Sequence, residues 1–179
     1  MTENESLPEE KTNLDPDKQN DSRFIVDGML GSIARKLRII GFDTVYSSNF
    51  EDGFLLEEAL NSGRILVTSD IELFLRAKRK KTATILVSSR IERDRLYEIL
   101  ASLGEKRIDL RSLKSRCSTC NGRLKKSASL LNEKIVFECI SCGKTYWRGG
   151  HWEKLTRLFR EVNFMLQNEQ NEMLRENQK

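Results

Sequence analysis

The sequence predicts an α/β fold in which helices cover a mainly parallel sheet, followed by a small cysteine-rich module and a C-terminal helix. From residue 23 to residue 104, short apolar runs alternate with segments of helical periodicity. This alternation is typical of βαβ units, whose strands run parallel. Two Cys-x-x-Cys pairs follow later in the chain, and apolar residues at three- and four-residue spacing mark its last segment.

The expected strands and helices alternate from the start of this region. The strands are expected at 24–27, 44–46, 64–68 and 84–87, and the helices at 33–40, 54–60, 71–80 and from about 89 to 104. In the first helix, Ile33, Ala34 and Leu37 share one face, and Gly41 suits the position after the helix end. Gly63 closes the second helix in the same way. Ser89-Arg-Ile-Glu92 predicts a capping box that opens the fourth helix.

The composition divides the 179 residues into four parts. Residues 1–22 hold seven acids against two lysines and both prolines, so we expect a disordered acidic tail. Residues 23–104 form the α/β domain. Residues 105–152 form a basic connector and the cysteine module, with eleven Lys or Arg against four Asp or Glu. Residues 153–179 are predicted to form an amphipathic helix that docks on its own protein rather than on a partner.

The chain lacks the apolar stretch of roughly 18 residues that a transmembrane helix needs, and it lacks a signal-peptide pattern at its start. We therefore expect a cytoplasmic protein with no membrane partner. The basic second half favours a polyanionic partner. A solvated basic surface with no partner is the alternative.

Acidic residues follow two of the predicted strands. Asp27 ends the first strand and Asp70 follows the third, so their carboxylates share one edge of the sheet if the two strands are neighbours. Asp52 and Glu72 lie close enough in sequence to reach that edge. Crowded carboxylates repel one another unless a cation is present, and Mg²⁺ or Mn²⁺ would fill that role. Asp is also a preferred helix N-cap, so capping stays an alternative for each aspartate. Asp43 starts a strand and is expected at the opposite edge.

Four cysteines form two knuckles, Cys117-Ser-Thr-Cys120 and Cys139-Ile-Ser-Cys142. Two matched pairs with strand-forming residues around the second predict a zinc ribbon in which four thiolates hold a structural Zn²⁺. A redox Cys-x-x-Cys is the less favoured alternative.

Basic and aromatic residues surround these knuckles and the first helix. Such a mixture suits stacking on unpaired bases and contact with phosphates. Arg35, Lys36 and Arg38 on the first helix could attract phosphates in the same way. Alternatively, the two tryptophans attach the ribbon to the main domain, His151 is structural, and these three helix charges are solvated. The candidate RNA-binding residues are Arg35, Lys36, Arg116, Arg123, Lys125, Lys126, Trp147, Arg148, His151 and Trp152.

Four stretches resemble one known family: VDGMLGSIARKLRIIGFDT, GRILVTSD, RCSTCNGRL and FECISCGKTYWRGGHW. They resemble the Mut7-C RNase domain family, a PIN-like domain fused to a zinc ribbon, from residue 23 to residue 152. The resemblance implies a PIN-like three-layer α/β/α fold and metal-dependent RNA cleavage. It implies that Asp27 and Asp70 are the principal metal-binding acids, and that Asp52 corresponds to an acid at the start of the second helix. Glu72 stands where similar domains often have Asp.

The expected function is a divalent-metal-dependent ribonuclease that hydrolyses RNA phosphodiester bonds, with Asp27, Asp52, Asp70 and Glu72 as catalytic residues. The expected partner is RNA, with the ribosome or tRNA as candidates. A non-catalytic RNA-binding or ribosome-associated adapter is one alternative. A phosphoacceptor receiver domain is another, but such domains usually carry an acidic pair beside the first strand, where this chain has Asp27-Gly-Met.

Overall fold

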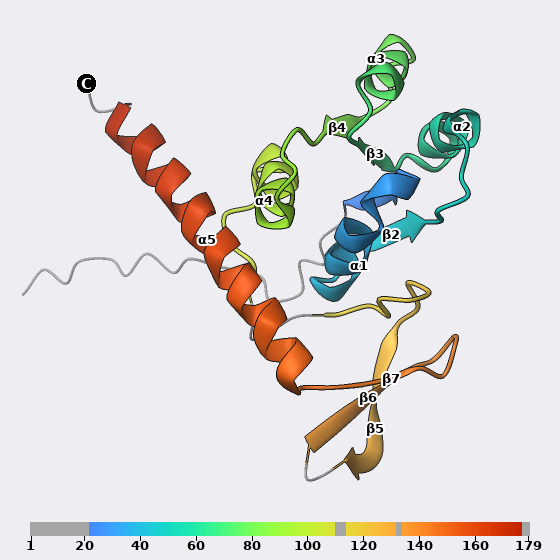
Figure 1. The fold of residues 1–179 in the computed structure, drawn as a ribbon, viewed down its shortest axis with the longest axis vertical. Helices are drawn as coiled ribbons and strands as arrows, with labels where there is room; N and C mark the ends of the chain where they lie inside the picture. Colours follow the sequence, from blue (N-terminus) through green and yellow to red (C-terminus); the bar gives the residue numbers. More distant parts are fainter. Residues whose placement is uncertain (1–21, 110–113, 132–133, 177–179) are drawn as a thin grey trace, which may run out of the picture.

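The computed structural model describes residues 22–109, 114–131 and 134–176, except for the side chains of 128–134 and 173 (Figure 1). The acidic tail expected at 1–22 lies outside these residues apart from Ser22. Among the helices described, none has both the length and the apolar character that crossing a bilayer requires.

Four parallel strands form the central sheet: β1 Arg23–Val26, β2 Asp43–Tyr46, β3 Ile65–Thr68 and β4 Thr84–Leu86. Their order is β2-β1-β3-β4, so β1 pairs with both β2 and β3. All three pairings are parallel. The carboxyl ends of β1 and β3 therefore lie side by side. This adjacency is the condition under which Asp27 and Asp70 were expected to share one edge of the sheet.

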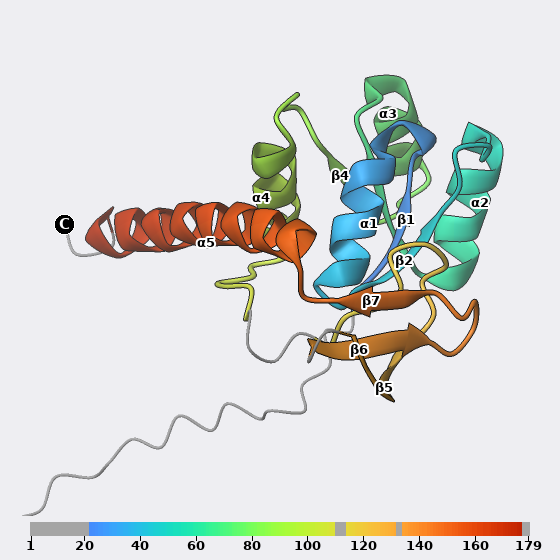
Figure 2. The same ribbon diagram turned by 60° about the horizontal axis from the view of Figure 1, so that its bottom comes forward.

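Helices cover both faces of this sheet (Figures 1 and 2). The alternation of side chains along β1 sends Phe24 and Val26 to one face and Ile25 to the other. On the first face lie α1 Gly31–Ile39, α4 Glu92–Ser102 and α5 Gly150–Glu176; on the second lie α2 Asp52–Ser62 and α3 Ile71–Arg79. The mainly parallel three-layer α/β/α fold is thus confirmed.

The predicted capping box at Ser89 is wrong. Helix α4 begins at Glu92, after an N-cap residue, Ile91, that makes no side-chain cap bond. Glu92 instead pairs with Lys36 of α1 at 2.7 Å. The backbone N–H of Ser89 donates to the carboxylate of Glu98, in the second turn of the helix. Glu92 therefore pairs with Lys36 on a neighbouring helix and not, as the sequence pattern suggested, with the start of its own helix.

Three antiparallel strands form the second sheet: β5 Leu124–Leu131, β6 Lys134–Cys139 and β7 Thr145–Trp147, in the order β5-β6-β7. They carry the two cysteine knuckles at one end. This cysteine-bearing sheet, from residue 114 to Trp147, is called the ribbon below. Helix α5 follows β7 directly and begins at Gly150, three residues earlier than expected.

The C-terminal helix docks on the main domain, as expected. Phe159, Val162 and Leu166 of α5 are fully or almost fully buried and share one hydrophobic cluster with Leu96 and Ile99 of α4. Burial of these residues is a large part of what holds α5 in place, since each fully buried side chain of this size contributes roughly 1.5–3 kcal/mol. Met173, part of the same predicted face, has a side chain outside the described set.

The ribbon packs against the amino end of the sheet, opposite the end that carries Asp27 and Asp70. Asp43, the first residue of β2, accepts a hydrogen bond of 2.8 Å from Nδ2 of Asn121 and pairs with Arg64 at 2.9 Å. The Asn121 side chain also accepts from the N–H of Thr44. The structure thus places Asp43 at the opposite edge, as expected, where it holds the ribbon.

Candidate functional site

Asp27 and Asp70 are linked through one hydroxyl. Thr68, the last residue of β3, donates from Oγ1 to Oδ2 of Asp27 over 2.8 Å. The same Oγ1 accepts from the backbone N–H of Asp70 at 2.9 Å. Thr68 is fully buried, and both acids are half-buried. The two acids therefore lie at one edge of the sheet in a relative position set by a buried side chain.

Both acids also cap helices, so the alternative raised by the sequence is part of the structure. Oδ1 of Asp70 accepts from the N–H groups of Glu72 and Leu73 at the start of α3. Asp27 caps the 3₁₀ helix Gly28–Leu30 through the N–H of Met29. Within the described part of the chain, Oδ2 of Asp70 receives no hydrogen bond. Capping and cation binding are therefore compatible, because capping uses only one oxygen of Asp70.

Asp52 and Glu72 are less closely tied to this pair. Asp52 opens α2 and forms an ion pair with Arg76 of α3 at 2.9 Å. Glu72 lies in the first turn of α3 with its side chain exposed. Among the residues that the structure describes, no three carboxylates lie within mutual reach of one ion. Two carboxylates are nonetheless enough for Mg²⁺, which commonly keeps several waters and binds substrate phosphates.

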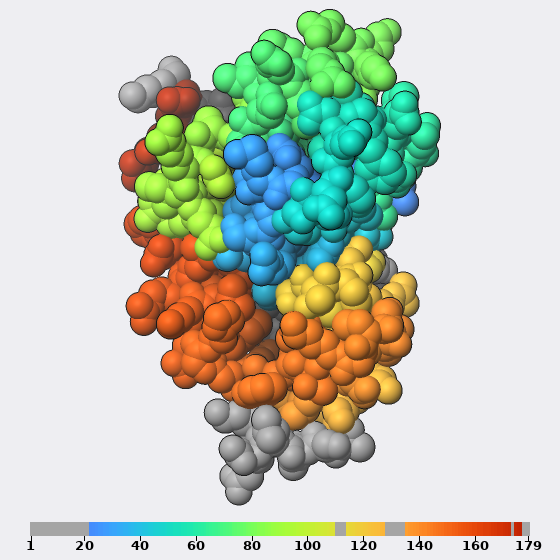
Figure 3. All heavy atoms as spheres, turned by 45° about the vertical axis from the view of Figure 1, so that its right-hand side comes forward, coloured from blue at the N-terminus to red at the C-terminus, as the bar shows by residue number. Residues whose placement is uncertain are grey.

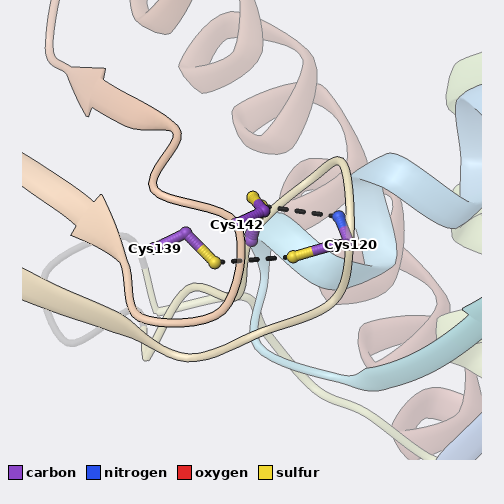
Figure 4. A group of neighbouring side chains, drawn as sticks. Cys120, Cys139 and Cys142 are labelled. Atoms are coloured by element: carbon purple, nitrogen blue, oxygen red, sulfur yellow. Dashed lines mark hydrogen bonds between the residues drawn. The ribbon is translucent and has the colours of Figure 1, made fainter.

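The four cysteines converge as the knuckle spacing predicted. Their Sγ atoms lie within 4.8 Å of one another, and Cys120 faces Cys139 at 3.4 Å (Figure 4). Cys117 and Cys142 lie 3.6 Å apart. Zn–S bonds of about 2.3 Å in a tetrahedron place neighbouring sulfurs about 3.8 Å apart. The donor set and its spacing are therefore compatible with a structural Zn²⁺.

Hydrogen bonds within the cluster favour a thiolate at Cys117. Burial alone would raise the pKa of this thiol, but the Tyr146 hydroxyl, 3.0 Å away, and neighbouring backbone N–H groups bring it to about 6. At Cys120 the N–H of Gly122 favours the thiolate, but the neighbouring cysteines raise the pKa to about 12. Cys117 is thus the more readily deprotonated ligand, and a bound cation would displace the proton of Cys120 into solvent.

Arg38 corrects an expectation based on helix α1. Its charge was expected to face solvent or attract phosphates, but the side chain is only 4% exposed. It donates from Nη1 to the carbonyl oxygens of Ser118 and Thr119 and from Nε to that of Thr44. Burial lowers the pKa of Arg38, while the thiol groups of the cluster raise it. Arg38 therefore ties the first knuckle to the main domain and places a positive charge beside the cysteines.

Six of the candidate RNA-binding residues line one cavity of about 800 Å³ between the ribbon, the end of α1 and the start of α5. Figure 3 shows the surface hollowed between the ribbon and α5, below α1. These six are Arg116, Arg123, Trp147, Arg148, His151 and Trp152. Because the ribbon sits at the amino end of the sheet, this cavity lies away from Asp27 and Asp70.

The other four candidates lie elsewhere. Lys125 pairs with Glu138 across β5 and β6 at 3.3 Å, and Lys126 is exposed on β5. On α1, Lys36 is engaged by Glu92 and Arg35 is exposed, with its Nε bonded to the carbonyl of Gly31. The structure therefore does not gather all ten residues into one surface.

Two basic residues that line the cavity, and one joint, were not among the sequence-based candidates. Arg107 and Lys114 line the cavity from the connector, whose basic composition was the available signal. Tyr146, which belongs to the aromatic and basic stretch that ends at Trp152, lines the cavity from β7, and its hydroxyl lies 3.0 Å from the sulfur of Cys117. The joint formed by Arg38, Asn121 and Asp43 had no local signal, because its partners lie about 80 residues apart in the chain.

Comparison with known proteins supports the resemblance noted from the sequence motifs. The family model described as the Mut7-C RNAse domain matches residues 22–159, which includes the sheet, the cysteine cluster and the first turns of α5. Searches of curated proteins and of solved structures give no match. The matched region carries both the acid pair and the four cysteines, and the family's description points to nuclease chemistry on RNA. The chain belongs to the Mut7-C RNase domain family.

Proposed function

We propose that this chain is a divalent-metal-dependent ribonuclease that hydrolyses RNA phosphodiester bonds. The observation that carries the proposal is the placement of Asp27 and Asp70 at adjacent strand ends, joined by the buried Thr68 hydroxyl. In an open parallel sheet, this edge is where functional sites form. Family membership supplies the class of substrate.

Asp27 and Asp70 would hold Mg²⁺ or Mn²⁺ in this proposal. Such an ion polarises a phosphate and lowers the pKa of a bound water. Asp52 and Glu72, at the starts of α2 and α3, would act as further acids at the same edge. In the structure, the ion pair with Arg76 orients the side chain of Asp52. Oδ2 of Asp70 is the oxygen best placed to bind the ion, since Oδ1 caps α3.

The four cysteines would hold a structural Zn²⁺ that folds the ribbon, and the ribbon with its basic connector would help to bind RNA. The exchange of one ligand tests the metal assignment. Cys139→Ser should lower bound zinc from about one ion per chain to a small fraction, measured by elemental analysis. Ser141→Ala is the matched control in the same knuckle. Equal zinc in Cys139→Ser and wild type would contradict the assignment.

Cleavage of a labelled single-stranded RNA with and without Mn²⁺ tests the reaction. Asp27→Asn and Asp70→Asn should each abolish Mn²⁺-dependent cleavage while RNA binding persists, because Asn keeps the shape but not the charge that binds the ion. Glu57→Gln, which neutralises an exposed carboxylate of α2, is the control and should cleave like wild type. Wild-type rates in both Asn variants would refute the proposal.

A non-catalytic RNA-binding adapter is the second candidate. The observation in its favour is that Asp27 and Asp70 both serve as caps and that the described residues hold no cluster of three carboxylates. RNA binding without any Mn²⁺ binding in calorimetry would select this candidate over the ribonuclease.

A further inference from the structure

We propose that the cavity between the ribbon, the connector and α5 is an anchoring site for unpaired RNA, separate from the acid pair. The proposal rests on the ribonuclease function above and adds to it the form of the substrate. An RNA chain held in this cavity must run past α1 to reach Asp27 and Asp70. Substrates would then be single-stranded and longer than the few nucleotides around the cleaved bond.

The first support is an exposed aromatic side chain that core packing does not explain. Trp147, on the last strand of the ribbon, lines the cavity and is 49% exposed. It therefore does not act as a buried attachment between ribbon and main domain. Trp152 also lines the cavity, and the guanidinium of Arg148 lies 5.1 Å from its ring centroid. An exposed indole, with a second indole and a cation in the same cavity, is an arrangement on which unpaired bases stack.

The second support is the charge of the cavity. Among the described residues, five Lys or Arg side chains line it against two carboxylates, Glu105 and Asp109. Arg116 is engaged by Asp43 at 3.8 Å and by the carbonyl of Asn121, so it serves the ribbon joint as well. Arg123 is exposed and forms no ion pair with any residue that the structure describes. A positive rim around aromatic faces is complementary to a nucleic acid strand, with phosphates at the rim and bases inside.

The third support is a route from the cavity toward the acids. Helix α1 spans nine residues, or about 13 Å, from the Gly31 end near Asp27 to the Ile39 end that lines the cavity. A smaller cavity of about 230 Å³ lies between α1 and the start of α5, and its charged lining residues are Lys36, Lys154 and Glu92, the carboxylate that pairs with Lys36. His151 lines both cavities. Two lysines, of which Lys36 is paired with Glu92, therefore continue from the anchoring site along the helix that leads to the acid pair.

An acidic peptide would satisfy the charge of the cavity but not its aromatic faces. Exposed indole stacks on bases, whereas a chain of carboxylates gains nothing from it. The aromatic and basic features together thus favour RNA.

Binding is tested in the zinc-loaded full chain carrying Asp70→Asn, with no Mg²⁺ or Mn²⁺ added, so that cleavage does not interfere. The probe is a fluorescein-labelled single-stranded RNA of about 12 nucleotides, read by anisotropy. Trp147→Ala should weaken binding about tenfold, as loss of one stacked base predicts. Ile140→Ala, at a still more exposed apolar position of the ribbon outside the cavity, should leave affinity unchanged.

Salt dependence separates the two kinds of contact. Arg123→Ala should reduce the slope of log affinity against log salt by about 0.7, the share of one phosphate on a single strand. Trp147→Ala should leave that slope unchanged. Arg79→Ala, an exposed cation at the end of α3, should change neither affinity nor slope. Unchanged affinity in both cavity variants would overturn the anchoring site, as would competition by polyglutamate as strong as that by unlabelled RNA.

Cleavage with Mn²⁺ distinguishes failure of this site from failure of the ribonuclease. The wild-type chain should cleave the 12-nucleotide RNA faster than one of about three nucleotides, and Trp147→Ala should slow only the longer substrate. Cleavage that depends on Asp70 but not on Trp147 would remove the anchoring site and leave the ribonuclease standing. RNA binding that depends on Trp147, with no cleavage at all, would refute the ribonuclease and leave the anchoring site standing.

Discussion

Thr68 donates a hydrogen bond of 2.8 Å to Asp27 from the strand next to it, and the same hydroxyl accepts from the backbone of Asp70. Because Thr68 is fully buried, this contact fixes the relative position of two acids that lie 43 residues apart. We expect Thr68→Val to weaken Mn²⁺ binding and to lower cleavage about tenfold or more, since small displacements in a site have large effects on rate. Thr68→Ser, which restores the hydroxyl, should recover both.

Thr82→Val is the matched control for that change. Thr82 is buried at the amino end of the sheet, and its Oγ1 has no hydrogen-bond partner among the described residues. Removing an unsatisfied buried hydroxyl should leave cleavage intact and raise the free energy of unfolding by about 1 kcal/mol. Equal loss of Mn²⁺ affinity in the Thr68 and Thr82 variants would show that the Thr68 hydroxyl has no specific role.

The hydrogen bonds of Arg38 should stabilise the joint between the ribbon and the main domain. Arg38→Met should lower the free energy of unfolding by about 3 kcal/mol, because three carbonyl oxygens lose a charged donor. Arg35→Met, at an exposed position on the same helix, should stay within about 0.5 kcal/mol of wild type. Urea denaturation measures both. An equal effect of the two changes would contradict the role of Arg38 as the connection between the two sheets.

The carboxyl group of Asp43 should make the stability of the same joint depend on pH. Burial alone would raise its pKa, but hydrogen bonds from Arg64 and Asn121 hold the pKa below the ordinary value of 3.8. A depressed carboxyl pKa stabilises the folded state fully above about 3.8, and this stabilisation disappears as the pH falls through the folded pKa.

The comparison of wild type with Asp43→Asn between about pH 6 and about pH 3 measures this effect. The variant should be less stable at the upper end, because Arg64 and Arg116 lose their charged partner. The difference in unfolding free energy should shrink as the pH falls below about 3.8 toward the lower pKa of the folded carboxyl. A difference that stays constant over this range would contradict the assignment.

Two phenylalanines of α5 test whether the C-terminal helix is part of the fold. Phe159→Ala should lower the free energy of unfolding by about 3–5 kcal/mol, because Phe159 is fully buried in the main cluster. Phe164→Ala, at a position that is 65% exposed, should have little effect. Thermal denaturation distinguishes them, and similar behaviour of the two variants would mean that α5 does not dock in solution.

The fold class was predictable because its signals are local. Alternating apolar runs and helical periodicity report burial one element at a time, and Gly63, with a left-handed backbone, ends α2 where the pattern indicated. The cysteine cluster was equally predictable, since knuckle spacing reflects metal geometry rather than long-range packing. The capping box at Ser89 failed because Lys36, on another helix, offered Glu92 a stronger partner.

By itself, the sequence determined the strands, the helices, the clustering of the four cysteines and the two acids at strand ends. Only the tertiary structure decided that β1 and β3 are neighbours, that Arg38 is buried against the first knuckle, and that the ribbon lies at the edge opposite Asp27 and Asp70. The physical reason is that hydrophobic periodicity identifies which face of an element is buried but not which element covers it. Strand order and ribbon position depend on contacts between distant residues, and these are fixed only when the chain packs.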